Sequence, residues 1–140
     1  MNAMKQTLFK VIFFSIFIYI LAFTNTYFSL SKFSDTISSG CLDCSFNSEV
    51  LRYCLIVLFL IPLLLIIERM NSSIKLKKII LVTFFCFLLY LINLILFDFR
   101  VASWETYSEL EILISVLFNS LMLPVSATLF FLYLKYIYFK

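Results

Sequence analysis

Four long apolar stretches, separated by short polar segments, dominate the pattern of hydrophobic and polar positions along the chain. At 1.5 Å of rise per residue, a helix of about 19 residues spans roughly 28 Å, which is close to the hydrocarbon thickness of a bilayer. The apolar runs are continuous and lack the in-and-out alternation that a membrane β-barrel requires. The pattern therefore predicts four membrane-spanning α-helices, at about 8–29, 50–67, 79–97 and 112–134.

Basic residues are divided unequally between the segments that connect these helices. The N-terminal tail, the connection 68–78 and the C-terminal end carry eight Lys and Arg residues, whereas the opposite side carries three. Short loops rich in Lys and Arg stay on the cytoplasmic side during insertion. We therefore expect both termini and the loop 68–78 in the cytoplasm, and two outer loops at 31–49 and 98–111.

The first apolar stretch has a second interpretation, because the run 11–23 follows two lysines and has the length of a signal-peptide core. The next segment, 24–30, lacks an A-x-A-like cleavage site and stays largely apolar. We therefore expect the first helix to be retained as a membrane anchor.

Composition supports a membrane protein and excludes several functions. Hydrophobic residues make up 64% of the 140 residues and charged residues 14%, too few to cover a water-soluble domain. The sequence thus predicts an all-α, four-helix integral membrane bundle, with residues 1–140 as one transmembrane domain in the lipid bilayer of a bacterial cytoplasmic (inner) membrane. The net charge of +3 includes no long basic tract, so we expect no nucleic-acid partner. The absence of histidine excludes His-dependent triads and His metal sites, and no metal or other cofactor is expected.

Polar and small residues recur at helical spacing inside three of the predicted helices, where lipid disfavours them unless another helix satisfies them. We predict that these polar seams face one another, with interhelical hydrogen bonds worth ~0.6 kcal/mol each on average. The seams are Ser15, Tyr19, Ala22 and Thr26; Thr83, Cys86, Tyr90 and Asn93; and Ser115, Asn119, Met122 and Ser126. The interpretation as helix packing competes with a functional one. Asn25, Asn93 and Asn119 fall in the outer half of the membrane, where a polar cluster can receive a small ligand or an inserting polypeptide.

A few single residues carry further predictions. Pro62 and Pro124 lie inside apolar stretches, where each removes a backbone hydrogen bond and favours a kink. Glu49 and Arg52, near the outer end of the second helix, can either extend their charged ends to the membrane surface or pair with each other. Trp104, the only tryptophan, is typical of an anchor at the headgroup boundary.

Cys41 and Cys44 form a C-x-x-C motif in the first outer loop, on the side of the membrane where thiols are oxidised. With this motif and four helices, the chain resembles bacterial disulfide-generating membrane oxidases of the DsbB type. The resemblance implies a thiol oxidoreductase that uses Cys41 and Cys44 with a quinone cofactor. That family carries a second cysteine pair in its second outer loop, and here the loop 98–111 contains none.

Taken together, these features favour a non-enzymatic protein that binds another membrane protein or a membrane-inserting peptide. An immunity protein against a pore-forming toxin is one concrete form of this hypothesis. The thiol oxidoreductase is the alternative, and an oligomeric channel subunit, with the chain as a homo-oligomer, is a third. The candidate binding residues are Asn25, Tyr90, Asn93, Asn119, Glu105 and Glu109.

Overall fold

The computed structural model describes the backbone of residues 2–139 and side chains from Leu8 onwards. Helices account for most of the described chain, and no strand occurs among these residues. The α-helices are α1 (Asn2–Leu30), α2 (Phe46–Tyr53), α3 (Leu60–Arg69), α4 (Ile74–Arg100), α5 (Glu109–Asn119) and α6 (Leu123–Tyr133), and short 3₁₀ turns occupy Ser31–Phe33, Cys54–Phe59 and Ala102–Trp104. The all-α prediction is confirmed.

Three segments of the described chain are long and apolar enough to cross a membrane. They are Leu8–Phe33, Phe46–Arg69 and Ile74–Trp104, and a fourth is added if the bent pair α5 and α6 counts as one span. Many of their largest apolar side chains point away from the bundle, and Phe59 and Phe118 are 65% and 73% exposed. Water would penalise such a surface and lipid accepts it, which indicates an integral membrane protein.

The second span is assembled from two α-helices and starts earlier than the sequence suggests. The Ser45 hydroxyl accepts a hydrogen bond from the amide of Ser48 and caps α2, so this helix begins at Phe46 and not near Val50. A 3₁₀ stretch, Cys54–Phe59, then joins α2 to α3. Pro62, the third residue of α3, has no N–H to donate to the preceding turn, and the change of helix type lies immediately before it.

The prediction of one continuous helix over 112–134 is wrong. The chain breaks at Ser120, and α5 and α6 meet at 59°. Pro124 is the second residue of α6, where its missing N–H costs no intrahelical hydrogen bond, so the predicted kink becomes a new helix start. At its other end α5 begins with a capping box, in which Ser108 and Glu111 satisfy each other's backbone amides.

Aromatic rings hold α1, α4 and α6 together in the middle of the bundle. Phe85 and Phe130 are fully buried with ring centroids 4.4 Å apart, and Phe14 packs 5.9 Å from Phe130. Phe17 stacks on Tyr133 at 4.3 Å. Lipid tails are as apolar as these rings, so the stabilisation comes mainly from close packing and dispersion.

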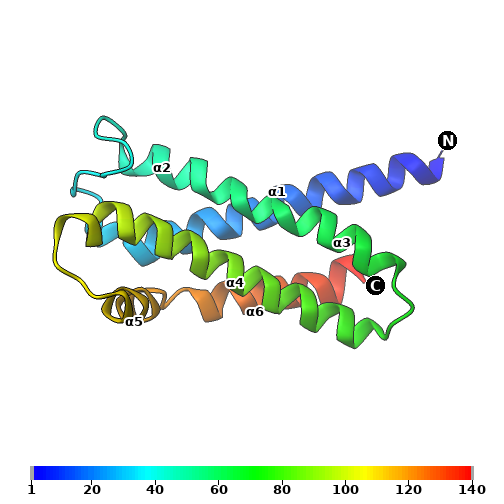
Figure 1. The fold of residues 1–140 in the computed structure, drawn as a ribbon. Coiled ribbons are helices and arrows are strands. Elements are labelled where there is room, and N and C mark those ends of the chain that lie inside the picture. The colour runs from blue at the N-terminus through cyan, green and yellow to red at the C-terminus, as the bar shows by residue number, and fades with distance from the viewer. Residues whose placement is uncertain (1, 140) are drawn as a thin grey trace.

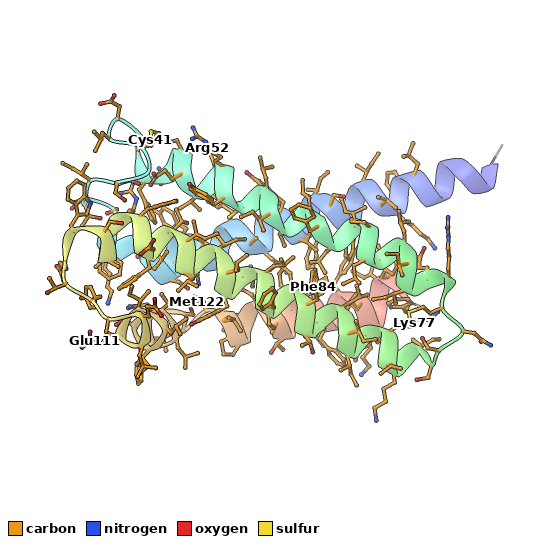
Figure 2. The ribbon with its side chains drawn as sticks, viewed as in Figure 1. Cys41, Arg52, Lys77, Phe84, Glu111 and Met122 are labelled. Carbon is orange, nitrogen blue, oxygen red and sulfur yellow. A yellow bond between two sulfur atoms is a disulfide. The ribbon has the colours of Figure 1, made fainter. Side chains whose placement is uncertain are left out.

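The bundle has two chemically different ends. The terminal end holds both chain termini and the α3–α4 connection, and the loop end holds the α1–α2 loop and the α4–α5 loop (Figure 1). Figure 2 shows Cys41 and Glu111 at the loop end and Lys77 at the terminal end. Of the basic residues in the described part of the chain, seven of ten belong to the terminal end, and seven of the eight acidic residues belong to the loop end.

Candidate functional site

A buried ion pair organises the loop end. The Nε of Arg100, the last residue of α4, donates a hydrogen bond of 2.7 Å to the carboxylate of Glu49 in the first turn of α2, and both side chains are 2% exposed. The guanidinium also lies 5.1 Å from the ring centroid of Phe46. Of the two alternatives for Glu49 and Arg52, the pairing with each other is therefore not formed, because Glu49 pairs with Arg100. Arg52 is exposed, and Glu49 faces the bundle, where α4 ends.

The remaining donors of Arg100 fasten the α1–α2 loop to the bundle. Its Nη1 donates to the carbonyls of Ser34 at 3.2 Å and Thr36 at 2.6 Å, and its Nη2 donates to the carbonyl of Cys44 at 3.4 Å. The planar guanidinium spreads five N–H donors over a fixed fork, so it can reach the Glu49 carboxylate and several carbonyls at once, whereas the ammonium of a lysine has only three donors on one atom. Sequence reasoning missed this role because the loop carbonyls that Arg100 binds carry no sequence signal.

The α1–α2 loop is cross-linked within itself by a disulfide and is joined to the α4–α5 loop by a hydrogen bond. Cys41 and Cys44 are disulfide-bonded, with Cα atoms 5.3 Å apart. The indole N–H of Trp104 donates to the carbonyl of Ile37 at 2.7 Å, so this tryptophan joins the two loops in addition to any role at the headgroup boundary. The disulfide and Arg100 thus belong to one ordered cap on the bundle.

Beneath this cap lies a buried polar layer formed by two asparagines and two serines. The amide nitrogen of Asn93 donates to the Ser120 hydroxyl at 2.9 Å, and the Ser126 hydroxyl donates to the amide oxygen of Asn25 at 3.5 Å. Both asparagines are fully buried. Within the described residues, Asn25 Nδ2 and Asn93 Oδ1 have no hydrogen-bond partner. One unsatisfied donor and one unsatisfied acceptor therefore remain buried, and each costs free energy unless water or a ligand reaches it.

The other predicted polar residues hold α5 in place. The Tyr90 hydroxyl of α4 donates to the carbonyl of Leu113 in α5 at 3.1 Å. Asn119, at the C-terminal end of α5, turns its amide onto the carbonyl of Ser115 at 2.7 Å and so stays within its own helix. Tyr90 is thus an interhelical contact, whereas Asn119 stabilises the last turn of α5, just before the break.

Seam residues of the third span do contact the fourth, but among the described residues no hydrogen bond joins members of two different predicted seams. Asn93 reaches Ser120 and Tyr90 reaches α5, as described above. Tyr19 of the first seam instead donates to the carbonyl of Leu51 in α2 at 2.9 Å, and Ser15 bonds its own helix. Thr83 and Met122 are exposed. Helix α1 meets α6 through Asn25, which lies beside the predicted stripe.

An apolar groove with acidic residues opens between α4 and α5. Its volume is about 370 Å³, and it is lined by Leu94, Ile95, Asp98, Glu109, Ile112 and Leu113. Figure 1 shows why it exists: α5 is seen nearly end-on while α4 runs lengthwise, so the two helices diverge. Asp98 and Glu109 are exposed, and no Lys or Arg of the described chain forms a salt bridge with either carboxylate. We call this feature the α4/α5 groove.

Glu105 does not join this groove. It lies in the α4–α5 loop and lines a separate hollow of about 340 Å³ together with Phe33, Arg100 and Trp104. As a hydrogen-bond acceptor and as a negative charge beside the phenol of Tyr107, the Glu105 carboxylate raises the pKa of Tyr107 above its ordinary value of 10.0. The predicted binding residues are therefore dispersed: Glu109 lines the groove, Asn25 and Asn93 are buried, Glu105 lies in the loop, and Tyr90 and Asn119 hold α5 in place.

The chemistry available at the loop end is recognition and thiol exchange. The groove offers apolar walls and carboxylates, and the disulfide offers a pair of exchangeable sulfurs. The other two cysteines, Cys54 and Cys86, lie in the second and third spans and are unpaired with each other. No family model matches the chain, and no curated protein and no solved structure matches it either.

Proposed function

We propose that the chain is a binding protein of a bacterial cytoplasmic membrane that captures a cationic, membrane-inserting helical peptide in the α4/α5 groove. In this proposal the protein crosses the membrane four times, with α5 and α6 together as the fourth crossing. The terminal end faces the cytoplasm and the loop end faces outward. The asymmetric distribution of charge supports this direction, since the basic terminal end is the one retained inside.

The acid-rimmed groove carries the proposal. Amphipathic helices are commonly recognised by an apolar groove that takes their hydrophobic face, and charged residues at its edge set their orientation. Here Ile95 and Leu113 belong to the apolar walls, and Asp98 and Glu109 supply two carboxylates without a basic partner in the described chain. A peptide with lysines beside an apolar face complements both features. Capture at the outer surface would keep such a peptide from assembling a pore, as an immunity protein does.

The direct test uses a synthetic amphipathic helix of leucine and lysine as the probe. The protein is reconstituted in phosphatidylcholine vesicles, and peptide binding is followed by the fluorescence of a label on the peptide. We expect Asp98→Asn with Glu109→Gln to weaken binding roughly two- to thirtyfold, since exposed charge pairs contribute about 0.2–1 kcal/mol each.

A matched control removes two carboxylates from the same end of the molecule. Asp35→Asn with Asp43→Asn changes two exposed residues of the α1–α2 loop, far from the groove lining. This variant should bind the peptide within about twofold of the unaltered protein. Equal losses in the two variants would mean that net charge, and not the groove, attracts the peptide. Equal binding of a leucine–glutamate peptide would also contradict the proposal.

The immunity form of the proposal has its own test. Co-expression with the product of the adjacent open reading frame should protect cells from its toxicity, and the two products should co-purify in mild detergent. Protection that is lost in the Asp98→Asn, Glu109→Gln variant would connect the groove to immunity. Toxicity that is unchanged by co-expression, together with no co-purification, would count against this form while leaving the peptide-binding result to stand separately.

The disulfide favours a second candidate function, thiol oxidation. In such a cycle, a partner dithiol is oxidised to a disulfide, and Cys41 and Cys44 are reduced to two thiols. A membrane quinone then takes the two electrons and two protons to become a hydroquinone. Thiol trapping in intact cells tests this: the pair should shift between oxidised and reduced forms with the quinone supply, and Cys44→Ser should accumulate mixed disulfides. A pair that stays oxidised under every condition would rule the cycle out and leave a structural disulfide.

A further inference from the structure

Three lysines surround a small apolar hollow at the terminal end of the bundle. The hollow has a volume of about 250 Å³ and is lined by Lys75, Lys78, Ile79, Phe131 and Lys135. It lies at the opposite end of the molecule from the α4/α5 groove. We call it the lysine pocket.

Helical spacing on two neighbouring segments brings these residues together. In the first turns of α4, Lys78 and Ile79 follow Lys75 by three and four residues, so both lie on the same face of the helix as Lys75. Phe131 near the end of α6 and Lys135, four residues later in the π-helical turn Leu134–Tyr138, share the facing side. The buried aromatic contact described above keeps α4 and α6 packed together, and this packing closes the pocket between them.

The three ammonium groups of the pocket lack acidic partners. Among the described residues, none of them forms a salt bridge with a carboxylate. The only acidic side chain of the terminal end is Glu68, and it accepts a hydrogen bond of 2.6 Å from the Tyr138 hydroxyl. The neighbouring Lys77 is directed away, because it donates to the backbone carbonyl of Glu68 at 3.3 Å. Like charges are therefore concentrated around the pocket, and the N-terminal end of α4 adds a positive partial charge.

We propose that the lysine pocket binds the headgroup phosphate of an anionic phospholipid. The lysines of α4 and Lys135 surround the phosphate, and the first methylene groups of an acyl chain lie on Ile79 and Phe131. An anion placed here relieves the mutual repulsion of the ammonium groups, and basic pockets between membrane helices on the cytoplasmic side are suited to anionic headgroups. The walls favour a lipid over free phosphate, since nearly all of the lining surface is apolar and lysines are its only charged residues.

Native mass spectrometry of the purified full chain tests the proposal. The protein is mixed in detergent with phosphatidylglycerol or with phosphatidylcholine of the same acyl chains, and the lipid that stays bound is counted. We expect phosphatidylglycerol to be retained at least about tenfold better, and Lys78→Gln with Lys135→Gln to remove most of this preference, since each basic residue near an anionic surface contributes a several-fold factor. Inorganic phosphate at the same concentration should not displace the lipid.

A matched control is available at the same end of the molecule. Arg69→Gln with Lys77→Gln removes the same amount of charge from residues outside the pocket lining. This variant should keep the preference for phosphatidylglycerol within about twofold. Equal retention of the two lipids by the unaltered protein, or equal losses in the two double variants, would overturn the proposal. Displacement by inorganic phosphate would overturn the assignment to a lipid.

A second measurement places the acyl chain. Phe131→Trp in a Trp104→Phe background leaves one tryptophan in the chain, at the pocket. Brominated phosphatidylglycerol should quench its fluorescence at a lower fraction of total lipid than brominated phosphatidylcholine does, and Lys78→Gln with Lys135→Gln should abolish the difference. Identical quenching curves for the two lipids would contradict a lipid seated in the pocket. Because this experiment uses no peptide and changes no residue of the α4/α5 groove lining, its outcome is independent of the proposed function.

Discussion

Replacing Arg100 by methionine removes the group that joins α2, α4 and the α1–α2 loop. The change leaves Glu49 buried without its partner, at a site where both side chains of the pair are 2% exposed. Breaking a buried pair from one side costs about 3–5 kcal/mol because the remaining charge stays desolvated. The lost hydrogen bonds from Arg100 to the loop carbonyls, at 2.6 to 3.4 Å, add less to this cost, because the carbonyls can bind water once the loop is released. The expected loss corresponds to a factor of roughly a hundred to several thousand in the folded-to-unfolded ratio.

Reversible unfolding in mixed micelles with increasing dodecyl sulfate measures this loss. Far-ultraviolet circular dichroism follows the helices, and the fluorescence of Trp104, the sole tryptophan, follows the loop end. Arg100→Lys should recover part of the stability, because an ammonium group keeps the charge but cannot bind the surrounding carbonyls as a fork does. We also expect the fluorescence of Arg100→Met to change at a lower dodecyl sulfate fraction than the helical signal, as the loop cap opens first.

Two further variants decide whether the ion pair is responsible. The double variant Glu49→Met, Arg100→Met should be more stable than Arg100→Met alone, since no uncompensated charge remains buried. Arg52→Met, which removes an exposed arginine from the same helix as Glu49, should change stability by no more than about 0.5 kcal/mol. Two results would refute the reasoning. Arg100→Met could be as stable as Arg52→Met, or the double variant could lose as much stability as the two single variants added together, which would mean that Glu49 and Arg100 are not coupled.

Three smaller predictions concern residues below and beside the Glu49–Arg100 ion pair. Ser120→Ala leaves the buried amide of Asn93 without its acceptor and should lower the free energy of unfolding by about 1–3 kcal/mol in the same assay. Trp104→Phe removes the bond between the loops and should increase backbone hydrogen exchange in the α1–α2 loop, while α1 stays protected. In ultraviolet pH titration, the tyrosinate signal that is lost in Tyr107→Phe should appear above pH 10.0, and Glu105→Gln should move this signal to lower pH. The stability linked to the raised pKa is fully present below the pKa of Tyr107 in the unfolded chain. It is lost as the pH rises through the pKa of Tyr107 in the folded chain.

The sequence by itself determined the helical class and the position of the apolar spans. Hydropathy is a local property, and a bilayer leaves a long apolar run only one way to satisfy its backbone, so tertiary contacts are not needed to predict a helix over Leu8–Ser29. Pro124 likewise marked a disturbance in the last apolar stretch. The charge difference between the two ends could also be counted without a structure, because adjacent connections alternate between the ends of a helical bundle.

Tertiary structure decided which residues form the candidate sites. Arg100 and Glu49 are 51 positions apart, and the sequence offered the nearer Arg52, so only the packing of α4 against α2 could select the true pair. The α4/α5 groove depends on the 59° bend, because a straight fourth helix would lie along α4 and leave no space between them. Local pattern carries information on what each segment buries, whereas angles between segments and the partners of buried charges follow from how the segments fill space together.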